Sequence, residues 1–467
     1  MKKIYFYDTS KKTKVEFVSL KPNIAKIYVC GPTVYDNSHL GHARSAIAFD
    51  LLHRVLKANG YEVVFAKNFT DIDDKIIKKM KEEGKSLDEI TNFYIKTYKN
   101  DMEILNILTN SFEPKATENL DAMKEMIENL LSKDIAYKTD DSVYFDVSKD
   151  KNYGSLSNQA SDENSIARVE TNNQKRNSSD FALWKFEKVS DVSFASNFGA
   201  GRPGWHIECS AMIEKHLAYK DEPFQIDIHC GGADLLFPHH ENEASQTRCA
   251  SGQNLAKYWM HNGFVNINGE KMSKSLGNSF FLKDVLKSYS GEVVRFYLLS
   301  SSYRANINFN EEDLLVSKKR LDKLYRVKKR VYEVTASKVN EKFENTVLEA
   351  LNDDLNTSLA FSFIDEFINS SNDSLDKNPK DKTLKQEIVA NIEFVEKVLG
   401  FGGSDAFSYF QFGVSLELKK EIEDLISKRV EAKKNKDFAK ADSIRDELSS
   451  MNISIMDTAL GVVWEYR

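Results

Sequence analysis

The sequence predicts an α/β protein: a Rossmann-type doubly wound parallel sheet that carries an insertion, followed by an all-α C-terminal half. Two observations predict the sheet and one predicts the helical half. A β-branched, apolar stretch, "AKIYVCG" (25–31), ends on a glycine. It is followed at 43–60 by apolar residues, Ile47, Leu51 and Val55, that repeat every four positions, as on one face of a helix.

A second strand and a second helix follow directly. "YEVVFAKNFTD" (61–71) has the texture of a strand, and "DDKIIKKMKEEG" (73–84) has a helical pattern. Strand, helix and strand in succession form a βαβ unit, which requires a parallel sheet. Gly60 stands where a helix commonly ends in a left-handed residue. Beyond about Gly291 the pattern is mostly helical, which predicts the all-α half.

The pattern of apolar and polar residues changes between 117 and 200, which predicts an insertion. "SVYFDVS" (142–148) predicts a short edge strand, and the polar stretches "SNQASDENS" and "TNNQKRNSSD" predict loops. Strand texture returns with "EPFQIDIHCGGADLLF". We expect units at 1–116 (first half of the sheet domain), 117–200 (connective insertion), 201–255 (second half), 256–320 (region with the "KMSKS" loop), 321–403 (helical bundle) and 404–467 (small C-terminal unit).

Length and composition bound the class of protein. The 467 residues, 41% of them hydrophobic, suffice for more than one domain, and no stretch approaches the roughly 20 apolar residues of a membrane span. The start, "MKKIYFYDTSKKTKVEF", lacks the apolar segment of a secretory signal, so we expect a cytoplasmic protein. A net charge of -6 argues against indiscriminate coating of nucleic acid.

Four cysteines are too few and too scattered for a disulfide framework: Cys30, Cys209, Cys230 and Cys249. Taken singly, each is more simply explained as a buried hydrophobe than as a metal ligand or a reactive thiol.

The stretch "SHLGHARS" places His39 and His42 around Gly41 at the predicted start of a helix. A helix N-terminus attracts anions, glycine permits close approach of a ligand, and imidazoles can donate to phosphate oxygens. "GEKMSKSLGN" (269–278) carries Lys271 and Lys274, which suit polyphosphate. Each motif alone has a simpler explanation, as satisfied histidines or as an exposed basic loop. In this order the pair is highly specific.

Two further stretches have the residue types of a zinc site. In "FPHHENE", Pro238 suits a first helical turn, and both His239 (i, i+4) and His240 (i, i+3) can share a face with Glu243. In "GRPGWHIECSAM", Trp205 and Cys209 are one turn apart if a helix begins after Gly204. Two thiolates, an imidazole and a carboxylate complete a tetrahedral set. The simpler alternative for "FPHHENE" is a helix start with favourable acidic residues.

Cys30, Thr70 and His229 stand at the carboxyl ends of three expected strands. Ligands bind outside those ends in an open parallel sheet. We therefore expect these three side chains to line one pocket.

The chain resembles the cysteinyl-tRNA synthetases from about residue 20 onward. The resemblance rests on the stretches above together with "NFTDIDDKI", "DFALWK", "YWMHNGFV", "DDLNTSLA" and "KDFAKADSIRDEL". The cysteinyl-tRNA synthetases are class I aminoacyl-tRNA synthetases, and "HLGH" replaces their HIGH signature while "KMSKS" matches the second. The resemblance implies an enzyme that activates L-cysteine with Mg-ATP and transfers it to tRNA(Cys). It also implies one Zn²⁺ per chain, which would bind the substrate thiolate, with His239 rather than His240 among the ligands: Cys30, Cys209, His239 and Glu243.

The resemblance further implies residue roles and domain roles. The catalytic residues would be His39, His42 and Lys274. The ATP-binding residues would be these three together with Gly31, Gly41, Asp234 and Lys271. The cysteine-binding residues would be Cys30, Thr70, Trp205 and His229. The segment 117–200 would contact the acceptor end of tRNA, 256–320 its stem, and 404–467 its anticodon. We expect a monomer that binds neither membrane nor DNA.

The basic stretch "VSKKRLDKLYRVKKRVYEV" (316–334) could follow the tRNA backbone. The tRNA-contact candidates are Lys318, Lys319, Arg320, Arg445 and Trp464. A solvated helix face is the simpler explanation for the basic stretch, and a packed core residue for Trp464.

Two departures from the family pattern concern the insertion and its return. "SDENSIA" is shorter and more polar than usual, and Phe198 stands where tryptophan is common. Two rival functions remain, a ligase of cysteine to a small amine and an inactive RNA-binding paralogue. The tail from about Ser404 argues against the first, and the intact signatures and metal ligands argue against the second.

Overall fold

The computed structural model describes residues 2–158, 174–186, 192–267, 270–271, 280–459 and 461–466. The chain forms two compact units. Unit 1 comprises Met1–Lys283, Ser301–Phe309 and Leu348–Leu359, and unit 2 comprises Asp284–Ser300, Asn310–Val347 and Ala360–Arg467.

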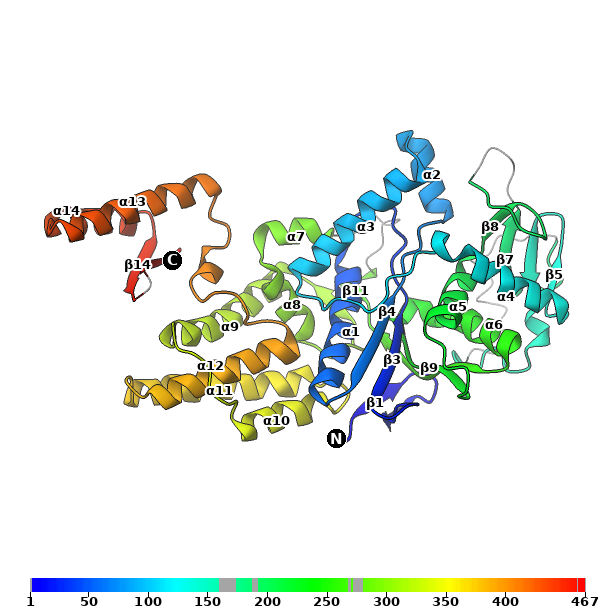
Figure 1. Cartoon of the computed structure of the whole chain (residues 1–467), viewed down its shortest axis with the longest axis horizontal. Helices are drawn as coiled ribbons and strands as arrows, with labels where there is room; N and C mark the ends of the chain where they lie inside the picture. The colour runs from blue at the N-terminus through cyan, green and yellow to red at the C-terminus, as the bar shows by residue number, and fades with distance from the viewer. Residues whose placement is uncertain are drawn as a thin grey trace. The chain divides into compact units, whose positions relative to one another are not determined.

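A four-stranded sheet forms the centre of unit 1. Its strand order is β10-β9-β3-β4 and every neighbouring pair is parallel. Figure 1 labels β3, β4 and β9 of this sheet. The strands are β3 (Ile24–Val29), β4 (Glu62–Lys67), β9 (Phe224–Gly232) and β10 (Asn254–Asn262). The chain moves outward in one direction from β3 to β4 and in the other from β9 to β10. The carboxyl ends of β3 and β9 therefore flank a topological switch point, where ligands bind in such sheets.

The first crossover confirms the predicted βαβ unit. Helix α1 (Leu40–Ala58) buries the predicted apolar face, with Ile47, Leu51 and Val55 at most 1% exposed. Gly60 follows with φ +89°, a conformation that favours glycine. Helices α2 (Asp74–Glu83) and α3 (Leu87–Ile104) come after β4.

The insertion contains a helix and an antiparallel sheet. Helix α4 (Leu120–Ser132) follows the short turn η1 (Thr117–Asn119), and the strand order is β5-β6-β7-β8. These strands are β5 (Ala136–Lys138), β6 (Ser142–Phe145), β7 (Phe181–Phe186) and β8 (Gly201–Pro203), with a turn η2 (Val147–Lys149) after β6. The prediction of an edge strand at "SVYF" is wrong. All four residues of β6 are buried because β7, which returns from beyond the polar stretches, pairs with its second edge.

The remaining elements of unit 1 return the chain to the central sheet. They are α5 (Trp205–His216), the turns η4 (Ala233–Leu235) and η5 (Leu236–His240), and α6 (Glu241–Ser251). Two smaller sheets are β1 (Tyr5–Asp8) with β2 (Thr13–Glu16), and β12-β11-β13, formed by Glu270–Lys271, Val265–Ile267 and Ile307–Phe309. Of the two polar stretches predicted as loops (157–165 and 171–180), residues 159–165 and 171–173 lie outside the described residues.

The C-terminal half is helical, as predicted. It contains α7 (Leu282–Ser288), α8 (Gly291–Leu299), α9 (Glu311–Arg330), α10 (Glu341–Leu351), α11 (Thr357–Lys377), α12 (Lys382–Leu399), η7 (Ser408–Gln411), α13 (Leu416–Lys434) and α14 (Phe438–Ser450). The chain then forms an antiparallel hairpin, β14 (Ile453–Thr458) with β15 (Gly461–Tyr466), where the sequence predicts helix only. Within the described part of the chain, no helix is both long and apolar enough to span a membrane.

Candidate active site

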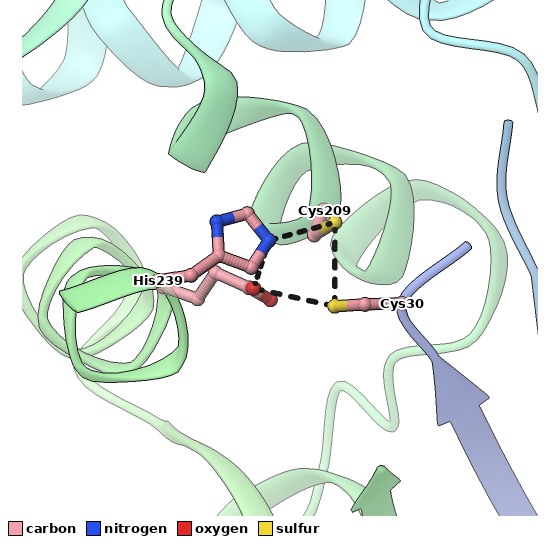
Figure 2. Close-up of side chains that lie close together, drawn as sticks. Cys30, Cys209 and His239 are labelled. Carbon is pink, nitrogen blue, oxygen red and sulfur yellow. Dashed lines mark hydrogen bonds and ion pairs between the residues drawn. The ribbon is translucent and has the colours of Figure 1, made fainter. Parts of the chain in front are cut away.

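Four side chains meet at the switch point of the central sheet. Cys30 follows β3, Cys209 is on α5, and His239 and Glu243 come from η5 and α6. Their potential ligand atoms all lie within 4.8 Å of one another, and all four residues are buried. Figure 2 shows the two thiols and the imidazole pointing toward a common centre.

The individual distances describe a compact donor set. The two sulfur atoms are 3.7 Å apart, and Sγ of Cys209 is 3.8 Å from Nε2 of His239. Oε1 of Glu243 is 2.9 Å from that nitrogen and 3.5 Å from Sγ of Cys30. Soft thiolates with one imidazole and one carboxylate are a donor set that suits Zn²⁺.

Local backbone geometry places these donors. Gly204 is the N-cap of α5, so Trp205 and Cys209 fall one helical turn apart, as predicted. Before α6 the expectation is wrong: Pro238 is not in the first turn of a regular helix. Phe237 is extended (φ -139°, ψ 132°), the Phe237–Pro238 peptide bond is cis, and α6 begins at Glu241.

A second overlapping set exists in the same place. Cys30, His229, His240 and Glu243 also offer ligand atoms within 4.8 Å of one another. Nε2 of His240 is 3.3 Å from Sγ of Cys30, and its Nδ1 is 2.8 Å from Nε2 of His261. Geometry therefore permits both histidines that the sequence spacing left open, but the set with His239 has two sulfur donors.

Two further histidines hold the donors in place. Nδ1 of His206 is 2.8 Å from Nδ1 of His239, and Nε2 of His229 is 2.8 Å from Oε2 of Glu243. Burial lowers the pKa of His206 well below its ordinary value, so this ring is neutral. Such second contacts fix ring orientation and ligand basicity at metal sites. Sequence spacing alone did not single out His206 or His261, because their partners are distant in the chain.

The acid–base properties of the cluster favour metal binding. Burial alone would raise the pKa of Glu243, but His239 and His229 outweigh it and hold that pKa well below its usual range. The hydrogen bond with Cys30 lowers the pKa of the Cys209 thiol to about 6, against the opposing effect of burial. Burial raises the pKa of Cys30. The pair thus readily supplies one thiolate, the form of cysteine that binds metals.

A cleft of about 730 Å³ opens beside the cluster. Its lining includes seven predicted site residues: Cys30, Gly31, His39, Gly41, His42, Trp205 and Asp234. Trp205 is 42% exposed and stacks on His239, with ring centroids 4.0 Å apart. Among the described residues, Thr70 and His229 do not belong to this lining. Thr70 is 2% exposed and donates its hydroxyl to Glu208 (2.8 Å), and His229 is fully buried.

The two signature histidines cap helix α1. The Gly41 N–H donates to Nδ1 of His39 (3.1 Å), and the His39 N–H donates to Nδ1 of His42 (3.3 Å). Their rings stack with centroids 3.8 Å apart. Because each Nδ1 is an acceptor, the neutral rings carry their proton on Nε2.

Close packing explains one glycine of the site. A Cβ on Gly31 would lie 1.6 Å from the carbonyl oxygen of Asn68, so no other residue fits there. The Asn68 side chain in turn accepts the Gly31 N–H at 2.8 Å. No sequence signal distinguishes Asn68 in advance.

The second signature lies largely outside the described residues. Strand β12 includes the backbone of Lys271, while Lys274 is not described.

The tRNA-contact candidates have varied surroundings in unit 2. Lys318 and Arg320 are paired within the unit, with Asp322 and Asp365 respectively. Lys319 and Arg445 are exposed. Trp464 is 5% exposed in an apolar cluster with Ile426 and Leu448, among others, which matches the packed-core alternative.

A parallel sheet, a helix that begins in "HLGH" and a cleft lined by the strand ends and the start of that helix are the features of a class I aminoacyl-tRNA synthetase. Residues 16–319 match the model for tRNA synthetases class I (C) catalytic domain, and residues 346–402 match that for the DALR domain. The chain is 72% identical over 465 residues to the cysteine--tRNA ligase of Aliarcobacter butzleri, covering 100% of both. It is 64% identical over 461 residues to that of Nitratiruptor sp., covering 98% of this chain and 99% of the relative. The chain belongs to the cysteine--tRNA ligase family.

Solved structures support the fold. A Mycobacterium tuberculosis methionyl-tRNA synthetase in complex with methionyl-adenylate superposes with a TM-score of 0.60 at 14% identity, covering 81% of this chain and 92% of that one. The Agrobacterium radiobacter K84 agnB2 LeuRS ternary complex gives 0.63 at 12% identity, covering 86% and 87%.

Proposed function

We propose that this cysteine--tRNA ligase activates L-cysteine in the cleft beside Cys30 and transfers it to tRNA(Cys). One observation carries the proposal: a buried donor set of two thiols, an imidazole and a carboxylate borders the cleft that begins at the "HLGH" helix. A nucleotide site and a thiol-selective site would then be adjacent, as the formation of cysteinyl-adenylate requires.

The reaction has two steps. First, a carboxylate oxygen of cysteine attacks the α-phosphorus of Mg-ATP, the bond to the β-phosphate oxygen breaks, and pyrophosphate leaves. Second, a terminal ribose hydroxyl of tRNA attacks the carbonyl carbon, AMP leaves, and the hydroxyl proton passes to the leaving phosphate or solvent. Phosphoryl transfer of this kind depends on positioning and charge stabilisation rather than on a protein nucleophile.

His39 and His42 serve the first step as hydrogen-bond donors. Their Nδ1 atoms are occupied in capping α1, so Nε2–H is the group that each ring can offer to the phosphate oxygens. The start of α1 adds its positive dipole end. Lys274, and with it Lys271, would bind the departing pyrophosphate as point charges. Asp234 and the backbone at Gly31 and Gly41 line the same space and are proposed ATP contacts.

Zn²⁺ fits the donor set of Cys30, Cys209, His239 and Glu243. The burial of all four and the support from His206 and His229 favour this fit. When bound, Zn²⁺ supplies a soft acceptor for the substrate thiolate, for which a serine hydroxyl is a poor substitute at neutral pH. Trp205 would cover the bound amino acid. Thr70 and His229 would act on the cysteine pocket indirectly, because Thr70 binds Glu208 and His229 binds Glu243.

The binding of tRNA is distributed along the chain in this proposal. Residues 117–200 contact the acceptor end, 256–320 the stem, and 404–467 the anticodon, where Arg445 is exposed. Lys318, Lys319 and Arg320 belong to the basic helix that would follow the RNA backbone; Trp464 contributes through the core of the C-terminal unit. We also propose that the protein is a monomeric, cytoplasmic enzyme that binds neither DNA nor membranes.

ATP–pyrophosphate exchange with each amino acid tests the proposal against its rivals. We expect exchange with cysteine, loss of exchange after chelation, and transfer to tRNA(Cys). Exchange without transfer would favour the cysteine:small-amine ligase. No exchange would favour the inactive RNA-binding paralogue.

A further inference from the structure

One wall of the cleft takes no part in the proposed activation of cysteine. It is formed by the end of β4 and by α2 with its neighbours, and it is rich in lysine and tyrosine. The residues of this wall, called the lysine wall below, are Tyr35, Lys67, Lys75, Lys78, Lys79 and Tyr98.

Among the described residues, two of the four lysines form no ion pair with a carboxylate. Lys78 lies 3.7 Å from Glu82, and Lys79 lies 3.4 Å from Glu83. Within the described part of the chain, Lys67 and Lys75 form no ion pair. Their ammonium groups lie over aromatic rings instead, Lys67 at 5.2 Å from the Tyr98 centroid and Lys75 at 5.5 Å from that of Tyr35.

The burial of Lys67 makes this arrangement informative. Its side chain is only 8% exposed, although it is a charged group in the lining of a cleft. Lysine is rarely so buried without a compensating anion. The carboxylates Asp36, Glu82 and Asp234 also line the cleft, but in the described structure none of them is ion-paired with Lys67 or Lys75. The lysine wall is therefore prepared for an anionic ligand.

The location of the wall indicates which anion it receives. The triphosphate of ATP is expected at the start of α1 and at the second signature, which are different segments. Asp74, beside Lys75, binds Arg202 of β8 and Lys185 of β7 (3.2 Å). These contacts hold the first turn of α2 against the insertion, whose proposed partner is the acceptor end of tRNA.

We propose that Lys67 and Lys75 bind phosphodiester groups of the single-stranded 3′ end of tRNA and so position the terminal ribose for transfer. The inference rests on the proposed function and deepens it. Lysines bind such phosphates by releasing counterions, which makes the affinity dependent on salt. Tyr35 adds a ring face on which an unpaired base can stack.

The variants Lys67→Gln, Lys75→Gln and the double variant test this role. Lys81→Gln is the matched control, since Lys81 is exposed on the same helix but outside the cleft lining. Two readouts separate the steps: cysteine-dependent ATP–pyrophosphate exchange without tRNA, and single-turnover transfer from preformed cysteinyl-adenylate to a tRNA(Cys) transcript.

We expect exchange within about twofold of the wild type for every variant. For the double variant, half-saturation of transfer should need about tenfold more tRNA, and the log–log salt slope should shrink by about 1.4 for two single-strand contacts. Lys67→Arg should keep part of the affinity for tRNA that Lys67→Gln loses, which distinguishes loss of the charge from misfolding at this buried position. Lys75 is exposed, so Lys75→Gln tests the role of the charge without the risk of misfolding.

Three outcomes would overturn the inference. An unchanged tRNA requirement and salt slope would show that these lysines contact no phosphate of tRNA. An equal loss in exchange and transfer would assign them to ATP. A wild-type chain that supports no exchange with cysteine would refute the proposed function itself, and this inference with it.

Discussion

The imidazole of His239 lies against the indole of Trp205, with their planes inclined by 21° and their centroids 4.0 Å apart. One ring belongs to the buried donor set and the other lines the open cleft. The stack therefore joins the proposed zinc site to the proposed cysteine pocket, to which Cys30 also belongs.

Replacing Trp205 by Ala should weaken cysteine binding without loss of the metal. An aromatic contact of this kind contributes about 0.5–1.5 kcal/mol, so the KM for cysteine should rise by up to about tenfold. Steady-state exchange kinetics and elemental analysis of zinc provide the two measurements. Trp205→Phe is the control that keeps a ring against His239. If Trp205→Ala lost its zinc while cysteine affinity per bound zinc stayed constant, Trp205 would support the metal site only.

The capping geometry of α1 allows the structural and chemical roles of His42 to be separated. Asn places an acceptor where Nδ1 stands, while Gln places an amide donor near Nε2. His42→Asn should keep the melting temperature and slow adenylate formation by about 10²-fold, as expected for one lost transition-state donor. His42→Gln should retain more activity but lose about 1 kcal/mol of stability with the cap. Stopped-flow activation and thermal melts measure these effects, and the opposite assignment of losses would refute the Nε2 role.

The second signature has a distinct prediction. Lys274→Ala should slow adenylate formation by about 10²-fold and change the Kd for cysteine by less than about twofold, since the lysine would contact pyrophosphate only. Presteady-state activation and equilibrium binding separate the two effects. Lys57→Ala, at an exposed position at the end of α1, is the control. A large loss of cysteine affinity with normal activation would contradict the assignment.

Asp354 anchors the "DDLNT" segment within unit 1. Its carboxylate accepts from the Tyr7 N–H (2.9 Å), the Tyr303 hydroxyl (2.9 Å) and the Arg304 guanidinium (2.9 Å). Asp354→Ala leaves these donors without their partner and should cost about 2–4 kcal/mol of unfolding free energy.

Asp353→Ala provides the matched comparison in a denaturant titration. Asp353 makes an exposed ion pair with Lys14 and should cost less than about 1 kcal/mol. Equal effects of the two substitutions would contradict the anchoring role.

The parallel sheet could be predicted because local signals were strong. The apolar repeat of α1 and the left-handed Gly60 follow from side-chain spacing and backbone sterics. The position of β6 within its sheet could not be predicted, because its second neighbour, β7, is separated from it in the sequence by the polar stretches. Likewise, β14 and β15 depend on burial of Trp464 and Ile453 against α13 and α14, a tertiary effect that local patterns do not report.

The donor set was predictable in its residue types but not in its choice of histidine. Helical spacing admits both His239 and His240, and the extended Phe237 shows why regular helical geometry is the wrong guide there. In the folded chain, two overlapping sets of donors still share Cys30 and Glu243. The supporting residues His206 and Asn68 depend on contacts between distant segments, which sequence spacing does not contain.

We propose that a metal ion held by Cys30, Cys209, His239 and Glu243 selects the substrate by its sulfur. Substitution of the protein with Co²⁺ makes that bond visible, because thiolate ligands give charge-transfer absorption and tetrahedral Co²⁺ gives visible bands. We predict that L-cysteine intensifies the charge-transfer absorption and shifts the visible bands, while L-serine changes neither. A spectrum that L-cysteine leaves unchanged, in protein that still forms cysteinyl-adenylate, would contradict the account.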